Sequence, residues 1–141
     1  MRTLLVPVDG SKNALRAVRY AAAQSKYCPV TLHLVNVEPP FDDYGMVRAY
    51  ITRRQHEAAV KKRAAGILAR AIPHARLPRV RCRAHAVIGV PPAVISNLAR
   101  RLRCDSIVMG TRGMTALGNL LLGSVANKVV HLADVPVTLV K

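Results

Sequence analysis

Short apolar runs alternate with segments of helical spacing along the whole chain, and this alternation restricts the possible folds more than any other feature. Continuous apolar or β-branched runs occupy residues 3–8, 30–37, 106–109 and 135–140, as in strands covered on both faces. Residues 80–88 instead alternate polar and small apolar side chains, which indicates a strand with one solvated face near a sheet edge. We therefore expect an α/β fold, a single-domain open five-stranded parallel sheet with right-handed crossovers and helices on both faces.

The segments between these runs carry signals for helix starts and helix faces. Ser11 is a suitable N-cap for a first helix, Pro91 or Pro92 opens a third, and Ser124 is predicted to cap the last one. A second helix is expected from about residue 47 to residue 72, with prolines beyond its end. The apolar stripe predicted for this second helix comprises Ala58, Ala65, Leu68, Ala69 and Ile72.

Length and cysteine content limit the class of protein. The chain has 141 residues, enough to bury one sizeable core, so we expect a single domain over residues 1–141. Cys28, Cys82 and Cys104 are an odd number without CxxC spacing, which argues against a disulfide framework or a zinc site and favours a cytoplasmic location. We expect no secretory signal, because Asp9 interrupts the short first apolar run and no small-residue cleavage site follows it. We expect no membrane span, because no apolar run reaches about 18 residues.

A glycine-rich segment before the last predicted helix is the part of the sequence that most suggests chemistry. It reads Gly110-Thr111-Arg112-Gly113, then nine residues, then Gly123-Ser124. Glycines let a backbone turn and expose its N–H groups, and the unpaired N–H groups at a helix start carry partial positive charge. Such a segment can bind phosphate oxygens, or it can serve only as a connection between two elements.

Two common nucleotide-binding motifs are absent from the sequence. A Walker A motif needs lysine directly after its last glycine, whereas Ser124 follows Gly123. The turn after the first apolar run reads Asp9-Gly10-Ser11-Lys12-Asn13-Ala14, which is not a dinucleotide-binding GxGxxG. We therefore expect neither phosphoryl transfer of the P-loop type nor NAD binding.

The chain resembles the universal stress protein family, in its nucleotide-binding branch, over nearly its whole length. The resemblance rests on Val6-Pro7-Val8-Asp9-Gly10-Ser11, on Leu34-Val35-Asn36-Val37 and on Ile107-Val108-Met109-Gly110. The glycine-rich segment also fits the G-2x-G-9x-G-S/T pattern of that branch without a gap. The resemblance implies a Rossmann-like sheet of the adenine nucleotide α-hydrolase type.

This resemblance implies a nucleotide site at the ends of the strands. The glycines and Ser124 would hold the phosphates, Asp9 would meet the ribose or the adenine, and Val37 would contact the adenine. Asp9 can instead hold an Asx-type turn, and Arg112 can pair with a phosphate or remain a solvated loop residue. The full set of implied nucleotide-binding residues is Pro7, Val8, Asp9, Val37, Met109, Gly110, Arg112, Gly113, Gly123, Ser124 and Val125.

The implied function is that of a cytosolic stress-response regulator or sensor that binds ATP, ADP or AMP, with or without Mg²⁺. We assign no catalytic or metal-ligating residue, because the serines lack a GxSxG context and the histidines lack metal-binding spacing. A binding protein is expected, with at most slow ATP hydrolysis or autophosphorylation; a slow ATPase is an alternative. Family members often dimerise through the last strand, so a homodimer through Val135 to Val140 is expected.

The strong positive charge allows a different function. The chain has 22 Lys and Arg against 7 Asp and Glu, a net charge of +15, and residues 48–103 hold 14 of the basic residues with Glu57 as their only acid. This basic block can bind an acidic partner, a polyanion or a nucleic acid in a salt-sensitive way. With one Phe, four Tyr and no Trp for base stacking, a solvated basic face is the plainer interpretation.

Overall fold

The predicted parallel sheet is present in the computed structural model of the chain, which describes residues 1–42, 45, 49–111 and 122–141. All strands pair in parallel, in the order β3-β2-β1-β4-β5. This arrangement confirms the predicted fold class. The strands are β1 (Arg2–Pro7), β2 (Val30–Glu38), β3 (Val80–Ile88), β4 (Ser106–Gly110) and β5 (Val137–Val140).

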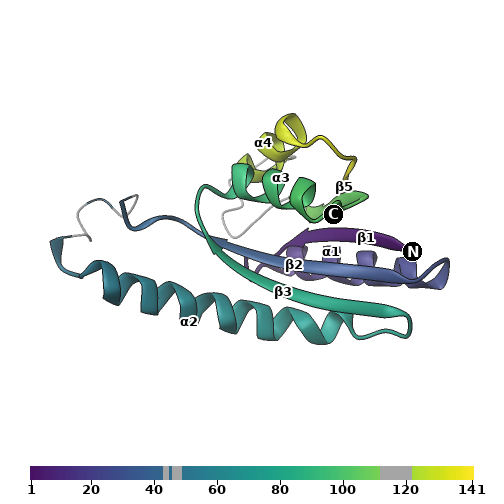
Figure 1. Ribbon diagram of the computed structural model, residues 1–141, viewed down its shortest axis with the longest axis horizontal. Helices are drawn as coiled ribbons and strands as arrows, with labels where there is room; N and C mark the ends of the chain where they lie inside the picture. Colours follow the sequence, from purple (N-terminus) through teal and green to yellow (C-terminus); the bar gives the residue numbers. More distant parts are fainter. Residues whose placement is uncertain (43–44, 46–48, 112–121) are drawn as a thin grey trace.

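Helices cover both faces of this sheet (Figure 1). α1 (Lys12–Ala23) and α2 (Arg53–Ala71) lie on one face, and α3 (Pro91–Arg101) and α4 (Ser124–Leu132) lie on the other. From β1 the chain builds outward to β2 and β3, and it then returns to place β4 and β5 on the other side of β1. The strand order therefore reverses between β1 and β4, the position at which open α/β sheets bind ligands.

An apolar core lies on each side of the sheet, because successive side chains of a strand point to opposite faces. Leu4 and Leu32 are buried on the side of α1 and α2, whereas Leu5 and Val35 of the same two strands are buried on the side of α3 and α4. β1 and β2 thus bury side chains on both faces, which explains why the sequence shows them as continuous apolar runs.

β3, at the edge of the sheet, is only partly covered on each of its two sides. Cys82 packs toward the core beneath α1 and α2. On the opposite side α3 packs over β1 and β2, and Arg81 and Arg83 of β3 remain exposed. β3 is thus an edge strand whose charged side chains are exposed, as its alternating pattern predicted. We define the open face as the side of β2 and β3 that carries Thr31, His33, Arg81, Arg83 and His85.

α2 differs from its prediction in where it starts and in which side it buries. It begins at Arg53, not near residue 47, because Thr52 and Gln55 form a capping box in which each side chain accepts a hydrogen bond from the other backbone N–H. None of the helices in the described part of the chain is long and apolar enough to cross a membrane. The buried side of α2 comprises His56, Val60, Ala64, Ile67, Leu68 and Ala71, whereas the predicted Ala58, Ala65 and Ala69 are exposed.

Two further boundaries near the end of the chain also correct the prediction. Gly123, with extended backbone angles, is the N-cap residue of α4, and Ser124 is its first helical residue and does not cap it. β5 begins at Val137 and not at Val135. Pro136 has no N–H to give to a ladder, although its carbonyl accepts a hydrogen bond from Ile107 N at 2.9 Å.

Candidate functional site

A cavity of about 580 Å³ opens at the carboxyl ends of β1, β2 and β4. Its position is the place where the strand order reverses, and its size lies within the range of small-molecule sites. Arg112 and Gly113 lie outside the described residues. All other residues of the predicted set line this one cavity, namely Pro7, Val8, Asp9, Val37, Met109, Gly110, Gly123, Ser124 and Val125.

The turn after β1 forms one wall of the cavity. Val8 N donates to Val35 O at 2.8 Å, which extends the β1–β2 pairing to the mouth of the cavity. Asp9 Oδ1 accepts a hydrogen bond from Ser11 N at 2.9 Å, and Ser11 Oγ accepts one from Ala14 N at 3.1 Å. Gly10 has a φ of +90°, a left-handed conformation that favours glycine. Asp9 therefore holds the turn in the way that Asx turns do, and it also lines the cavity.

Gly110, at the end of β4, has a packing role that its motif alone does not reveal. A Cβ atom at this position would lie 2.9 Å from Asn13 Cβ and 3.0 Å from the backbone carbon of Asn13. The glycine therefore lets the first turn of α1 approach β4 closely. Its neighbour Thr111 donates from its N–H to Val140 O at 3.0 Å and accepts a hydrogen bond from Gly123 N at 2.6 Å. These bonds fix the start of α4 beside the end of β4.

The N-terminus of α4 gives the cavity a partly positive wall. Ser124, Val125 and Ala126 all line the cavity. In the described part of the chain, the first backbone bond of α4 runs from Asn127 N to Gly123 O at 2.9 Å, so the N–H groups of Ser124, Val125 and Ala126 have no carbonyl partner within the helix. Aligned peptide dipoles add partial positive charge at the same end. This wall suits the oxygens of an anion such as phosphate.

Another part of the cavity wall is apolar. Val35 and Val37 from β2, Ile95 from α3 and Met109 from β4 line it. Val35, Ile95 and Met109 are buried residues of the core between the sheet and the pair α3 and α4. A cavity that combines an apolar wall with a partly positive wall suits a ligand with a flat apolar part and an anionic part.

Several residues of the cavity were not predicted from the sequence, and Arg63 is the most informative of them. Arg63 reaches the cavity from α2, and its Nη1 lies 3.2 Å from Oε2 of Glu38 at the end of β2. The side chain of Glu38 is 8% exposed and that of Arg63 is 55% exposed, so the pair leaves the guanidinium accessible. The other missed residues are Ser11, Ala14, Val35, Pro39, Pro91, Ile95, Thr111 and Ala126, most of which stand at predicted strand ends or helix starts.

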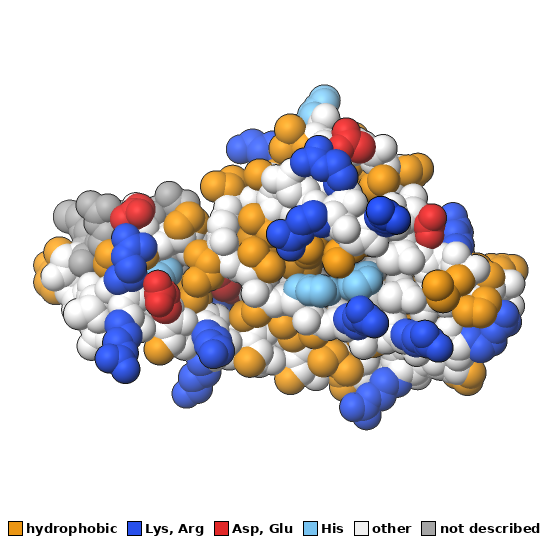
Figure 2. Space-filling view, in the orientation of Figure 1, with side chains coloured by type: hydrophobic (Ala, Val, Ile, Leu, Met, Phe, Trp, Pro, Cys, Tyr) orange, Lys and Arg blue, Asp and Glu red, His pale blue; other side chains and the backbone are white. Residues whose placement is uncertain are grey.

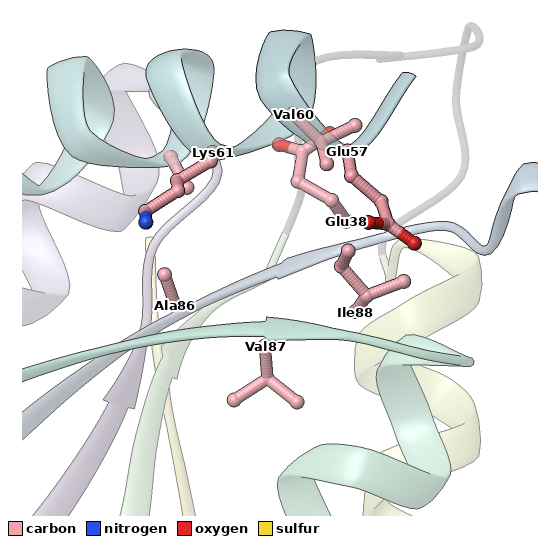
Figure 3. A pocket seen from close by; sticks show the side chains of 8 residues that line it. Glu38, Glu57, Val60, Lys61, Ala86, Val87 and Ile88 are labelled. Atoms are coloured by element: carbon pink, nitrogen blue, oxygen red, sulfur yellow. The ribbon is translucent and has the colours of Figure 1, made fainter. Parts of the chain in front are cut away.

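A second, smaller cavity of about 280 Å³ lies between α2 and the edge strand β3. Figure 3 shows Glu38 and Glu57 together at one end and Lys61 at the other, with Ala86 and Ile88 on the side of β3 toward α2. Val87 points to the opposite side of β3 in this view. Glu38 connects the two cavities, because it lines this one and pairs with Arg63 of the larger one.

The basic block does not form one continuous surface. Arg63 pairs with Glu38 on the α2 side of the sheet, whereas Arg81 and Arg83 lie on the open face. Two other arginines of the block form ion pairs: Arg53 Nη2 lies 3.6 Å from Asp42 Oδ1, and Arg100 Nη1 lies 3.3 Å from Asp134 Oδ2. Several arginines of the block are thus paired with acids, whereas Arg81 and Arg83 are exposed on the open face.

The thiols of two cysteines are poor nucleophiles. Burial raises the pKa of Cys104 to about 11, with a further contribution from the negative charge of Asp105, and burial also raises the pKa of Cys82. Both thiols are therefore protonated at neutral pH. Within the described ranges, no group of three His, Cys, Asp or Glu side chains is placed to hold a metal ion.

The sequence model of the universal stress protein family matches residues 1–141. The chain belongs to the universal stress protein family. As a universal stress protein it is 35% identical to a relative from Thermus aquaticus, over 99% of this chain and 98% of that protein. Its fold is similar to the structure of a universal stress protein from Archaeoglobus fulgidus, with a TM-score of 0.75, 25% identity, and coverage of 100% of this chain and 98% of the other.

Some similar structures were solved with adenine nucleotides. A universal stress protein from Archaeoglobus fulgidus in complex with dAMP has a TM-score of 0.71 and 23% identity, covering 100% of this chain and 98% of that chain. A universal stress protein in complex with cAMP and one from Arabidopsis thaliana with AMP have TM-scores of 0.67 and 0.62 at 24% and 19% identity, and they cover 96% and 92% of their own chains. At these identities the likeness establishes a shared fold.

Proposed function

We propose that this universal stress protein binds an adenine nucleotide, ATP or its products ADP and AMP, in the cavity at the carboxyl ends of β1, β2 and β4. The observation that carries the proposal is the pairing of an apolar wall with the N-terminus of α4 in one cavity of about 580 Å³. The complexes of similar proteins with dAMP, cAMP and AMP support the same ligand class.

Different lining residues would contact different parts of the nucleotide. Gly123, Ser124 and Val125 would hold the phosphates through the backbone N–H groups at the start of α4. Val37 and Met109 would contact the adenine on the apolar wall. Arg63, the guanidinium left accessible by its pair with Glu38, would add positive charge near the phosphates.

The remaining residues of the predicted set complete the same site. Pro7 and Val8 would contact the nucleotide from the end of β1, and Asp9 would meet the ribose or the adenine from the turn it supports. Gly110 would keep the backbone close to the ligand. Arg112 and Gly113 stay predicted phosphate contacts.

We further propose that nucleotide occupancy makes the protein a cytoplasmic regulator or sensor in the stress response. The described part of the cavity contains Asp9 as its only carboxylate, so it offers at most slow ATP hydrolysis or autophosphorylation. If Mg²⁺ accompanies ATP, Asp9 is the hard oxygen ligand the cavity can supply. ATP turnover by the wild type that matches turnover by Asp9→Ala would count against catalysis and leave binding intact.

The first test is to purify the protein without added nucleotide, denature it and identify the released small molecules by mass spectrometry. Titration calorimetry with ATP, ADP and AMP then gives the affinities. We expect Gly123→Val to abolish binding, because its side chain would occupy the approach to the α4 N–H groups. Gly66→Ala on α2 is the matched control, because a Cβ at Gly66 meets nothing closer than an Arg70 side-chain atom at 3.7 Å. Equal nucleotide affinity in the folded Gly123→Val and Gly66→Ala proteins would refute the phosphate contact.

A homodimer through the edge strand β5 is a second part of the proposal. β5 pairs with β4 on one side, and Leu139 is 38% exposed. Leu139→Asp is expected to convert a dimer to a monomer in sedimentation velocity, because it places a charge in the proposed interface. Val130→Asp on α4, at a side chain of similar exposure, should leave the dimer unchanged. A wild-type monomer at high concentration would refute this contact.

Polyanion binding by the basic block is a second candidate function, which the net charge of +15 favours. Lys61 and Lys62 lie exposed on α2. We expect RNA affinity to fall steeply with salt and to weaken in Lys61→Gln/Lys62→Gln, because such binding depends on counterion release. No binding of an RNA oligonucleotide at low salt would remove this candidate.

A further inference from the structure

The sheet has two edges, and the proposed homodimer uses only one of them. β5 forms one edge and β3 forms the other. All nine residues of β3 pair with β2, and no strand in the described part of the chain pairs with its outer side. An edge strand of this length presents a row of backbone N–H and C=O groups to which another extended segment can bind.

The hydrogen bonds at the two ends of β3 identify the backbone groups that point outward. Val30 N donates to Arg79 O, and Gly89 N donates to Glu38 O, both at 2.9 Å. Because such bonds alternate in a parallel ladder, the odd-numbered residues of β3 bond to β2 and the even-numbered ones face outward. The outward groups belong to Val80, Cys82, Ala84, Ala86 and Ile88. Among the described residues, only the outward N–H of Val80 has a backbone partner, Leu77 O at 3.2 Å.

The side of β3 toward α2 has an exposed apolar surface. Ala84, Ala86 and Ile88 alternate along the strand, and all three are exposed. Ala86 and Ile88 also line the cavity of about 280 Å³, together with Val60 and Ala64 of α2 (Figure 3). An extended segment along β3 would direct every second side chain over this surface and one of them toward the cavity.

The other side of β3 is cationic. Arg81 and Arg83 are exposed there, and neither forms an ion pair with an acidic side chain in the described ranges. His33 Nδ1 lies 2.8 Å from His85 Nε2, so these two histidines contact each other on the same face. Figure 2 shows the histidines next to each other, with Lys and Arg side chains on both sides of them. The remaining side chains of an added segment would therefore meet positive charge.

Acidic side chains fit the arginine side of β3 and not the cavity side. Alternate residues of a strand are about 6.6 Å apart, so acidic residues at alternate positions match the spacing of Arg81 and Arg83. Glu38 and Glu57 lie together at one end of the cavity, where they would repel an acidic side chain (Figure 3). The apolar lining of the cavity favours an apolar side chain instead. The two sides of β3 thus select opposite kinds of residue.

We propose that the β3 edge binds an extended segment of a partner protein in which acidic and apolar residues alternate. The segment continues the sheet beyond β3 by pairing with the outward backbone groups. Its acidic side chains pair with Arg81 and Arg83, and one apolar side chain enters the cavity beneath α2. In this mode of recognition the backbone bonds supply affinity, and the alternate side chains supply specificity. A second copy of β3 does not fit, because it would bring arginines against arginines.

This surface is separate from the sites of the proposed functions. No residue of β3 lines the cavity of about 580 Å³, and β5 lies at the other edge of the sheet. Partner binding at β3 therefore requires neither nucleotide nor the homodimer, and its failure would leave both intact. It also differs from polyanion binding, because it depends on backbone pairing and on an apolar contact.

The first test adds a capped heptapeptide of alternating Glu and Val to the full-length ¹⁵N-labelled protein. Hydrogen exchange of the β3 amides is followed by NMR at low salt. We expect the peptide to slow exchange at the outward N–H groups of Cys82, Ala84, Ala86 and Ile88 more than at the odd-numbered positions. A peptide of the same composition with all Glu before all Val should bind at least about tenfold more weakly, because it cannot separate charge from apolar contact.

N-methylated peptides separate backbone pairing from charge attraction. One heptapeptide carries methyl groups on the Glu nitrogens, and the other carries them on the Val nitrogens. Only every second N–H of an added strand faces β3, so one of the two peptides should lose binding and the other should keep it. With Val on the side of α2, methylated Glu abolishes binding of a parallel segment and methylated Val abolishes that of an antiparallel one.

Two protein variants and a control test the other side of the contact. Arg83→Gln should weaken binding of the alternating peptide about fivefold, because it removes an ion pair. Lys128→Gln, at an exposed position on α4, makes the same change in net charge and should stay within about twofold of the wild type. Ala86→Pro removes an outward N–H without touching the bonds to β2 and should weaken binding about tenfold. Thermal unfolding checks that each variant is folded.

Several results would overturn the proposal. One is unchanged hydrogen exchange at the outward amides of β3 with saturating peptide. A second is equal binding of both N-methylated peptides and the parent, which would indicate charge attraction without strand addition. A third is equal weakening in Arg83→Gln and Lys128→Gln. Slowed exchange at these amides with an RNA oligonucleotide but not with the alternating peptide would assign the edge to a nucleic acid instead.

Discussion

The two faces of the sheet differ in how completely they are covered. On the side of α1 and α2, one core extends from Val80 and Cys82 of β3 to Val140 of β5. On the side of α3 and α4, the core reaches β3 only at Val87, near the carboxyl end of that strand. The side of α1 and α2, which we call the closed side, therefore has the more extensive core, and on the open face Arg81 and Arg83 remain exposed.

The comparison predicts its largest effect within a single strand. Leu34→Ala on the closed side of β2 should lower the free energy of unfolding by about 2–5 kcal/mol, because it removes a fully buried side chain and leaves a cavity. Thr31→Ala on the open face of the same strand should change it by no more than about 0.5 kcal/mol. Chemical denaturation measures both. Similar losses in the two variants would mean that the open face is covered in solution.

A second prediction concerns the close approach of α1 to β4. Gly110→Ala should cost about 1–3 kcal/mol of unfolding free energy and weaken nucleotide binding, because its Cβ would press on Asn13. Gly66→Ala, in an open position on α2, should stabilise the protein by about 0.5–1 kcal/mol. Thermal and chemical unfolding of the pair give the contrast. A neutral Gly110→Ala would show that α1 is able to move away from β4.

A third prediction compares two ion pairs of α2. Arg63→Met should destabilise the protein by about 1 kcal/mol, because it leaves the buried carboxylate of Glu38 without its partner. Arg53→Met should cost no more than about 0.5 kcal/mol, because both members of the Arg53–Asp42 pair are exposed. Equal costs in urea denaturation would contradict the burial of Glu38.

The smallest effect is a pH dependence that arises on the open face. The pKa values of His33 and His85 are lower in the folded protein, so the unfolded chain binds more protons as the pH falls below about 6.5. The free energy of unfolding should therefore decrease from about pH 7.5 to about pH 5.5. His85→Gln should show a shallower decrease. A steeper decrease of the unfolding free energy in His85→Gln would contradict a lowered pKa of His85 in the folded protein.

The order of the strands and helices could be read from the sequence because each element has its own period. β3 is the clearest case, since its alternation of charged and apolar residues reports a strand with one solvated side. The burial of α2 could not be read in the same way. Ala58, Ala65 and Ala69 are small enough to occupy either side of a helix. The start of α2 is fixed by the capping box of Thr52 and Gln55, which the apolar pattern does not report.

The glycine motif predicted where strands end and helices begin around the cavity. It did not predict which side chains pack against each other there. The pattern Gly110 to Ser124 marked the ends of β4 and the start of α4, although Gly123 and not Ser124 is the N-cap residue. It did not show that a side chain at position 110 would collide with Asn13. In the sequence Arg63 cannot be distinguished from its basic neighbours Lys61 and Lys62. Its role is visible only in the structure, where it pairs with Glu38. For the same reason the His33–His85 contact, 52 residues apart, had no local signal.

The charge of the edge strand β3 has a consequence for behaviour at high concentration. A nine-residue edge strand presents unpaired backbone groups on which other chains can assemble into aggregates. Two copies of β3 meeting edge to edge would bring Arg81 and Arg83 of each copy together, with Arg79 directly before each strand. The resulting repulsion keeps this edge from extending into an intermolecular sheet. The arginines of β3 thus oppose aggregation by charge repulsion. High salt, or neutral substitutions at these positions, should shorten the time to visible precipitation.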